Sequence, residues 1–141
     1  MLEAKGIIKY YGSLEVLKGV DISIQKGEIV SIVGSSGAGK TTLLHILGTL
    51  DSPDKGELYF EGKRTDQLKG KALAAFRNQN IGFVFQFHHL LPDFDALENV
   101  ILPQLIADVA PDLAQERATY LLTQLGLSER LQHRPSKLSG G

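Results

Sequence analysis

The sequence predicts an α/β protein, and three adjoining stretches of the 141-residue chain carry that prediction. Residues 28–33, EIVSIV, contain four β-branched Ile or Val residues without clean alternation. That pattern is typical of a strand buried on both faces of a parallel sheet. A glycine-rich loop follows, and residues 40–50, KTTLLHILGTL, are expected to form a helix. Its broad apolar face is predicted to comprise Leu43, Leu44, Ile46 and Leu47.

Three shorter strands are expected outside this strand–loop–helix unit, each bounded by glycine; they cover residues 6–12, 20–27 and 57–62. In the second of them, Val20, Ile22 and Ile24 alternate with polar residues, which is the period of a half-buried strand. Residues 51–56, DSPDKG, have the composition of a turn. The first half of the chain is therefore predicted to be rich in strands.

The second half is predicted to be mostly helical, with helices at residues 71–79, 95–106 and 112–125. A further buried strand, IGFVF, is expected at residues 81–85. Asp95 is a plausible N-cap for the helix that follows it, and Pro103 is expected to bend or end that helix. Gly126 stands where the C-terminal cap of the last helix belongs. The apolar face of that helix is predicted to comprise Ala114, Ala118, Leu121, Leu122 and Leu125.

The composition excludes several classes of function. The net charge is -1 at pH 7, so no overall field would draw the protein to nucleic acid or to anionic lipid. The chain has no cysteine, which excludes disulfides, thiolate metal sites and a cysteine nucleophile. No apolar run approaches the ~20 residues that span a bilayer, and the N-terminus lacks the apolar run of a signal peptide. We expect a cytoplasmic protein, or one that a partner holds at a membrane.

The strongest chemical signal is GSSGAGKTT, which fits the pattern G-x-x-x-x-G-K-[ST]. Glycines let backbone N–H groups curl around a polyphosphate, and the helix that follows adds its N-terminal partial charge. Lys40 is expected to reach the β- and γ-phosphates, and the Thr41 hydroxyl to hold Mg²⁺. A chance glycine-rich turn is the alternative, but a buried strand before it and an apolar helix after it favour nucleotide binding. The loop alone does not distinguish a kinase, a GTPase and a transport ATPase. The predicted nucleotide ligands are Gly34, Ser35, Ser36, Gly37, Ala38, Gly39, Lys40, Thr41 and Thr42.

Four motifs in order resemble the ATP-binding cassette family of ATPases. KYYG resembles the family's adenine-stacking loop, and LKGVDISIQKGEIVSIVGSSGAGKTTLL resembles its lead-in and phosphate loop. IGFVFQ resembles the strand that enters the glutamine loop, and LSGG resembles the start of the signature LSGGQ. The resemblance covers the whole chain. It implies a P-loop NTPase core with an antiparallel β subdomain over residues 1–86, and a helical subdomain over residues 87–141.

The resemblance also implies roles for individual residues. Tyr11 would stack on adenine, and Gln86 would contact Mg²⁺ and the attacking water. Ser139, with Gly140 and Gly141, would face the γ-phosphate bound by the other subunit of a homodimer that sandwiches two ATP molecules. Taken singly, Tyr11 could be a surface strand residue, Gln86 an ordinary strand end and Ser139 a helix N-cap.

The stretch FQFHHLLPDFDALENV resembles the branch that includes lipoprotein-release, macrolide-export and cell-division ATPases, and it is most similar to the lipoprotein-releasing kind. The resemblance implies a peripheral ATPase on the cytoplasmic side of the inner membrane, with integral membrane transporter subunits as partners and no nucleic acid. The other two transport functions remain as alternatives, as do a soluble cassette ATPase acting on DNA or ribosomes and a non-catalytic nucleotide-binding fragment.

Two other features of this stretch have plainer interpretations. Adjacent His88 and His89 do not share a face of a helix or strand, and no Cys or carboxylate spacing of a known site accompanies them. We therefore expect no metal site there. Nearby apolar residues are expected to be core residues, or to dock a coupling helix of a membrane subunit as the resemblance implies. They are Leu90, Leu91, Phe94 and Leu97.

The residues that complete ATP hydrolysis in this family, an Asp, a Glu and a His, all follow the signature. Glu61 comes too early to replace them, and it fits better in a hairpin that leads into a glycine turn. We therefore expect the chain to be part of a longer ATPase and to be hydrolysis-deficient alone. In the family a later strand pairs beside residues 28–33, so without it this stretch is expected to expose an apolar edge.

Overall fold

The computed structural model describes residues 1–86 and 89–139. The chain divides into two compact units, Met1–Arg77 and Asn78–Gly141, and each unit is described by itself. The predicted boundary after residue 86 concerns the functional subdomains of the family, and it stays a prediction. No helix in the described part of the chain is long and apolar enough to cross a membrane.

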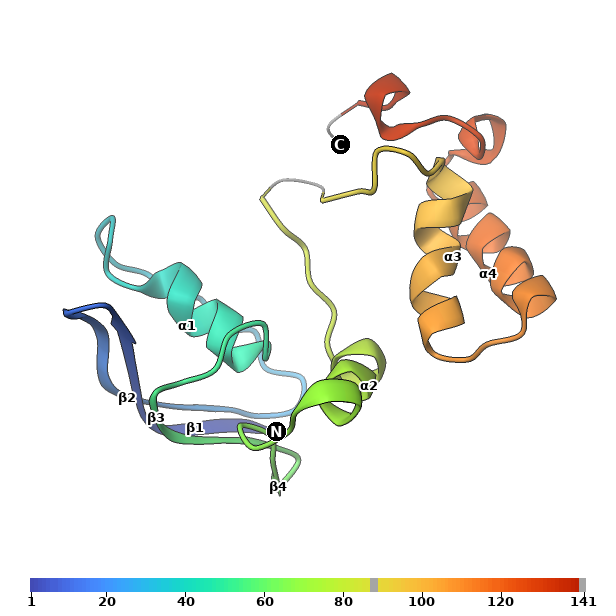
Figure 1. The fold of residues 1–141 in the computed structure, drawn as a ribbon. Helices are drawn as coiled ribbons and strands as arrows, with labels where there is room; N and C mark the ends of the chain where they lie inside the picture. The colour runs from blue at the N-terminus through green and yellow to red at the C-terminus, as the bar shows by residue number, and fades with distance from the viewer. Residues whose placement is uncertain (87–88, 140–141) are drawn as a thin grey trace. The chain divides into compact units, whose positions relative to one another are not determined.

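The first unit is built on a four-stranded antiparallel sheet with the order β2-β1-β3-β4 (Figure 1). The strands are β1 (Leu2–Tyr11), β2 (Leu14–Ile24), β3 (Lys55–Phe60) and β4 (Lys63–Arg64). A tight turn joins β1 to β2, where Tyr11 pairs with Leu14. The strands expected at residues 6–12, 20–27 and 57–62 are confirmed, and all three begin earlier than their patterns indicate.

The two strands that were expected to be buried in a parallel sheet do not form among the described residues. Residues 28–33 and 81–85 have no strand assignment. Ile29 is 98% exposed and Val33 85% exposed, so the prediction of burial on both faces is wrong, whereas the expected exposure of apolar side chains is confirmed. A strand exists only where a neighbour completes its hydrogen-bond ladder, and no described residue pairs with either segment.

Helix α1 (Lys40–Leu47) lies along one face of the sheet (Figure 1) and contributes three residues to the core between them. Leu43, Ile46 and Leu47 are buried, whereas Leu44 is half exposed and lies outside the contact. Helix α2 (Gly70–Asn80) follows β4, and its Phe76 ring meets Phe60 edge-on at 5.3 Å between centroids. The sheet contributes the remaining core residues, Ala4, Ile7, Leu17 and Leu58.

In the second unit, α3 (Ala96–Ile106) packs against α4 (Pro111–Gln124), and two 3-10 turns follow, η1 (Ser128–Arg130) and η2 (Pro135–Lys137). The prediction that Asp95 caps α3 is confirmed. Its carboxylate accepts the Glu98 N–H at 2.8 Å, and the Glu98 carboxylate accepts the Asp95 N–H at 2.8 Å. This reciprocal capping box satisfies two N–H groups at the helix start. The helix continues through Pro103 to Ile106, so the proline does not end it.

The last helix ends at a glycine, as predicted. Gly126 has φ 74°, and its N–H donates to the Thr123 carbonyl at 2.9 Å while the Leu127 N–H donates to the Leu122 carbonyl at 2.9 Å. These two bonds form a Schellman motif, which uses a residue in the left-handed region. Ala114, Ala118 and Leu122 are buried, but Leu125 is 75% exposed, so its placement on the apolar face was wrong. Leu125 is the cap residue, beyond the last helical turn.

We predict that Asp95→Ala lowers the free energy of unfolding by about 1 kcal/mol, because it removes the side-chain half of the capping box. Urea denaturation followed by far-UV circular dichroism measures the change. Asp93→Ala is the matched control, since among the described residues the Asp93 side chain makes no hydrogen bond. Equal effects of the two substitutions would contradict the role of the capping box.

Candidate phosphate-binding site

The predicted phosphate loop leads directly into α1. Gly39 is the N-cap of the helix, and its carbonyl accepts the Leu43 N–H at 2.8 Å. The Lys40 amine folds back and donates to the carbonyls of Gly34 at 3.0 Å and Ser35 at 2.7 Å. The lysine charge therefore lies at the beginning of the loop, on the same side as the positive end of the helix dipole. Both charges favour an anion at this position.

Gly39 is held so close to the sheet that a side chain there would crowd β2. A Cβ atom placed on Gly39 would lie 2.9 Å from Leu17 Cδ2, 3.0 Å from Val16 Cγ1 and 3.1 Å from the Val16 carbonyl oxygen. Its φ of 84° lies in the left-handed region, which glycine adopts without strain. The start of α1 thus rests directly on β2, and this contact fixes the loop relative to the sheet.

The rest of the loop is open to solvent. Residues 34–38 and Thr41 are exposed, while Lys40 and Thr42 are partly buried. A glycine-rich turn of exposed residues, with a lysine amine beside it, suits the oxygens of a polyphosphate. The Thr41 hydroxyl is an accessible oxygen ligand of the hard type that Mg²⁺ prefers. Among the described residues no cluster of His, Asp or Glu could hold a metal, so Mg²⁺ at Thr41 would depend on phosphate oxygens for further ligands.

Tyr11 belongs to the same unit and takes part in a polar network at the end of β1. Its hydroxyl donates to Asp51 Oδ2 at 2.9 Å, and the Lys9 amine donates to Asp51 Oδ1 at 2.9 Å and to the Ser52 carbonyl at 2.6 Å. The amine also lies 5.5 Å from the centroid of the Tyr11 ring, within range of a cation–π contact. Tyr11 is 51% exposed, so part of its side chain remains available to a ligand.

Both charges in this network persist over a wide pH range. Burial raises the pKa of the Asp51 carboxyl, but hydrogen bonds from Lys9, Tyr11 and the Ser52 backbone outweigh burial and hold that pKa below its usual value. Burial lowers the pKa of the Lys9 amine, yet the hydrogen bond and the charge of Asp51 leave it raised. The ion pair is therefore fully formed near neutral pH.

The other predicted site residues lie in the second unit. Gln86 is exposed and sits in a bend next to Phe85, whose ring meets the His89 ring edge-on at 4.7 Å. Ser139 is exposed and follows η2 without being part of a helix. Gly140 and Gly141 lie outside the described residues, as does His88 of the histidine pair. Tyr11, the loop and Lys40 thus share one unit, while Gln86 and Ser139 share the other.

The apolar stretch before α3 is held by one amide side chain. Asn99 accepts the Leu91 N–H at 2.9 Å and donates to the carbonyls of Leu91, Phe94 and Asp95 at 3.2, 3.2 and 2.8 Å. Leu90, Leu91 and Phe94 are 37%, 42% and 38% exposed, so they are not fully buried core residues. Asn99 gives the turn a fixed conformation with these apolar side chains partly open to solvent.

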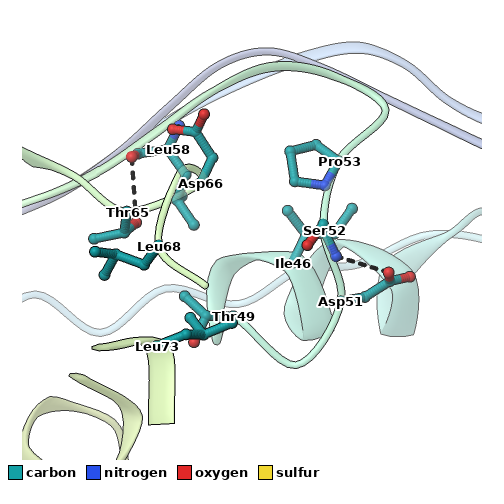
Figure 2. A pocket seen from close by; sticks show the side chains of 10 residues that line it. All are labelled: Ile46, Thr49, Asp51, Ser52, Pro53, Leu58, Thr65, Asp66, Leu68 and Leu73. Atoms are coloured by element: carbon teal, nitrogen blue, oxygen red, sulfur yellow. Dashed lines mark hydrogen bonds between the residues drawn. The ribbon is translucent and has the colours of Figure 1, made fainter. Parts of the chain in front are cut away.

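The first unit also contains a cavity below the turn that follows α1, but this cavity is not the nucleotide site. Its volume is about 10 Å³, enough for roughly one water molecule and far too small for a nucleotide. Figure 2 shows Asp51 at one side of the cavity, where its carboxylate accepts a hydrogen bond from the Ser52 N–H. The buried Thr49 hydroxyl also lines it, and among the described residues this hydroxyl has no hydrogen-bond partner. The phosphate loop is a solvent-exposed surface feature instead.

Comparison with known proteins agrees with the motifs. The sequence model described as ABC transporter matches residues 17–141, which is most of the chain. The chain belongs to the ABC transporter family. The resemblance described above is thereby confirmed. ABC transporter cassettes carry the P-loop NTPase fold, so the α/β fold class is confirmed too, although the described residues of this chain pair only as an antiparallel sheet.

Among ABC transporter sequences, the chain is 59% identical over 141 residues to the lipoprotein-releasing system ATP-binding protein LolD of Bacteroides thetaiotaomicron. The match covers 100% of this chain and 65% of that protein. A LolD protein of Porphyromonas gingivalis is 58% identical, with 100% of this chain and 64% of that protein covered. The chain therefore spans just under two thirds of the length of these relatives.

The structural relatives are also ABC transporter cassettes. One is the dimeric structure of a post-hydrolysis state of the ATP-binding cassette MJ0796 bound to ADP and Pi, with a TM-score of 0.87 and 38% identity. A second structure of MJ0796, described as dimeric and as a bacterial ABC transporter cassette, gives a TM-score of 0.88 at 38% identity. Each match covers 99% of this chain and 64% of the other.

Two residues near the candidate site, Lys9 and Asp51, were not predicted from the sequence to take part in it. Lys9 is only 9% exposed, and Asp51 lies in the segment identified only as a turn. A signal for Lys9 was present, because it follows buried Ile7 by two residues in a strand, so a charged side chain falls on the inward face. Its partner was not predictable from local pattern, since Asp51 is 42 residues away.

We predict that Gly39→Ala lowers the free energy of unfolding by roughly 2–4 kcal/mol, from backbone strain and from overpacking against β2. Gly37→Ala is the matched control. Gly37 has a similar φ of 78°, but a Cβ there would meet nothing within 4 Å. It should cost only the strain, about 1–2 kcal/mol. Urea denaturation measures both, and an equal loss in the two variants would mean that the Gly39 contact with β2 is unimportant.

Proposed function

We propose that this chain is the ATP-binding part of a transport ATPase that drives release of lipoproteins from the bacterial inner membrane. The observation that carries the proposal is the 59% identity, over every residue of the chain, to a protein named for that system. The loop geometry supports the ATP part independently, because Lys40 and the start of α1 place positive charge beside exposed backbone N–H groups.

Within this proposal the residues of the loop have separate tasks. Residues 34–39 donate backbone N–H groups to the phosphates, and Lys40 moves from the carbonyls of Gly34 and Ser35 to the β- and γ-phosphates. Thr41 holds Mg²⁺, which supplies charge neutralisation at the phosphates when bound. Thr42 completes the first turn of the helix. Tyr11 stacks on the adenine base.

The residues of the second unit act on hydrolysis and coupling. Gln86 orients the attacking water, contacts Mg²⁺ and passes the nucleotide state to the membrane subunits. Ser139, Gly140 and Gly141 contact the γ-phosphate held by the other copy of a homodimer. The dimeric state named for MJ0796 supports such an assembly. Binding of ATP closes the dimer, and hydrolysis opens it.

The partners in this proposal are integral membrane transporter subunits of the LolC and LolE type, and the ATPase lies on the cytoplasmic side of the inner membrane. The partly exposed side chains of Leu90, Leu91 and Phe94 suit contact with an apolar face of such a subunit. Asn99 fixes the turn that carries them, so the surface needs little ordering when a partner binds.

We predict that Lys40→Ala weakens binding of Mg·ATP on the order of 10- to 100-fold, because it removes charge-assisted hydrogen bonds to the phosphates. Isothermal titration calorimetry of the purified protein measures the affinity. Lys26→Ala, in an exposed turn, removes the same charge away from the loop and should bind ATP as the unaltered protein does. Undiminished ATP binding by Lys40→Ala would refute the assignment of the loop.

The transport part is tested in the source organism by exchanging the gene for its Lys40→Ala form. We predict that lipoproteins destined for the outer membrane then accumulate in the inner-membrane fraction after density-gradient separation. A strain with normal lipoprotein distribution but increased macrolide sensitivity or filamentous cells would instead assign the protein to drug export or cell division.

A further inference from the structure

The aromatic ring of Tyr11 has contacts that reach beyond its own strand. Its hydroxyl is bonded to Asp51, in the turn after α1, and the Lys9 amine joins the same carboxylate from β1. The Ser52 N–H donates to Asp51 Oδ1 at 2.7 Å as well. The Asp51 carboxylate therefore accepts three hydrogen bonds, and its position is set from β1 and from its own turn.

Lys9 contacts Asp51, Ser52 and the Tyr11 ring at once. Its side chain is 11% exposed, and its amine donates both to Asp51 Oδ1 and to the Ser52 carbonyl while lying over the Tyr11 ring. A buried ammonium with two acceptors and an aromatic face has little freedom to move. The ring of Tyr11 is consequently fixed by its hydroxyl at one point and by a cation on one face. The remaining surface is open, as its 51% exposure shows.

The Lys9–Asp51–Tyr11 network is connected to the start of α1 through the pairing of β1 with β2. Lys9 pairs with Leu17 in the β1–β2 ladder, and Leu17 is the residue that would lie 2.9 Å from a Cβ on Gly39. The turn that contains Asp51 is attached to β1 again at Tyr10, whose N–H donates to Asp54 Oδ2 at 2.6 Å. The Tyr11 ring thus belongs to the β1–β2 hairpin, and the loop packs against the same hairpin where Gly39 meets Val16 and Leu17.

We propose that Lys9 and Asp51 are positioning residues that hold the Tyr11 ring for a nucleoside base, and so determine how much more tightly the site binds a nucleoside triphosphate than a bare polyphosphate. This inference rests on the proposed contact between Tyr11 and the base. Neither residue touches the phosphates in this arrangement. Their effect is confined to the base, because a pre-ordered ring loses less conformational entropy when the base stacks on it.

The test compares Mg·ATP with Mg·tripolyphosphate, which has phosphates but no base, by calorimetry on the full chain. Tyr11→Ala removes the ring and should weaken ATP binding roughly 10- to 100-fold, the usual value of one stacked base. Asp51→Asn and Tyr11→Phe keep the aromatic ring but weaken or remove the hydrogen bond that holds it to residue 51. Each should weaken ATP binding about 3- to 10-fold. All three variants should bind tripolyphosphate within about twofold of the unaltered protein.

Tyr10→Phe is the matched control for Tyr11→Phe. Tyr10 is the adjacent residue, its hydroxyl donates to Glu15 Oε1 at 3.1 Å, and it takes no part in the Asp51 network. Its ATP affinity should be unchanged. The double variant Tyr11→Phe with Asp51→Asn should bind ATP no more weakly than the poorer single variant, because both substitutions break the same contact.

The outcomes separate this inference from the proposed function. If Tyr11→Ala loses ATP affinity while Asp51→Asn and Tyr11→Phe keep it, the positioning role is overturned and the base contact stands. If Tyr11→Ala binds ATP normally, the base contact fails and the inference fails with it. If Asp51→Asn weakens ATP and tripolyphosphate equally, the residue supports the whole fold, and the positioning role is likewise overturned.

Discussion

The close approach of Gly39 to β2 is the contact on which the rest of the first unit depends. It sets the start of α1 against Val16 and Leu17, with no room for a Cβ atom between helix and strand. From that point α1 extends over the sheet and buries Leu43, Ile46 and Leu47. The positive end of the helix dipole and the Lys40 amine therefore both lie at the phosphate loop, on the surface. The contact of Gly39 with β2 therefore positions both the core side chains of α1 and the groups proposed to bind the phosphates.

The hairpin of β1 and β2 extends this arrangement to a second part of the candidate site. Its register places Lys9 beside Leu17, and Lys9 in turn holds Asp51 and lies over the Tyr11 ring. A polyphosphate and a base attached to it need recognition groups at a set separation. The hairpin carries Tyr11 and holds the end of the loop at Gly39, so it sets the separation between the two groups. The ATP-binding proposal therefore requires movement of the Lys40 side chain but no rearrangement of the β1–β2 hairpin.

Local features were predictable from the sequence, and features that depend on distant partners were not. The glycine–lysine loop, the Asp95 cap and the Gly126 helix end are each determined within a few residues, and the structure has all three. Residues 28–33 have the composition of a strand but lack a ladder partner among the described residues, and composition cannot supply one. The Lys9–Asp51 ion pair joins residues from separate elements, so the strand pattern indicates that Lys9 faces inward but does not identify its partner.

The central claim is that residues 34–42 bind the phosphates of ATP while Tyr11 contacts its base. Backbone amide chemical shifts of the isotope-labelled protein, recorded during titration with Mg·ATP, test this most directly. The account predicts the largest shift changes at residues 34–42 and at Tyr11, and with tripolyphosphate the changes at Tyr11 should disappear while those of the loop remain. Saturable ATP binding that leaves the amides of residues 34–42 unchanged would contradict it.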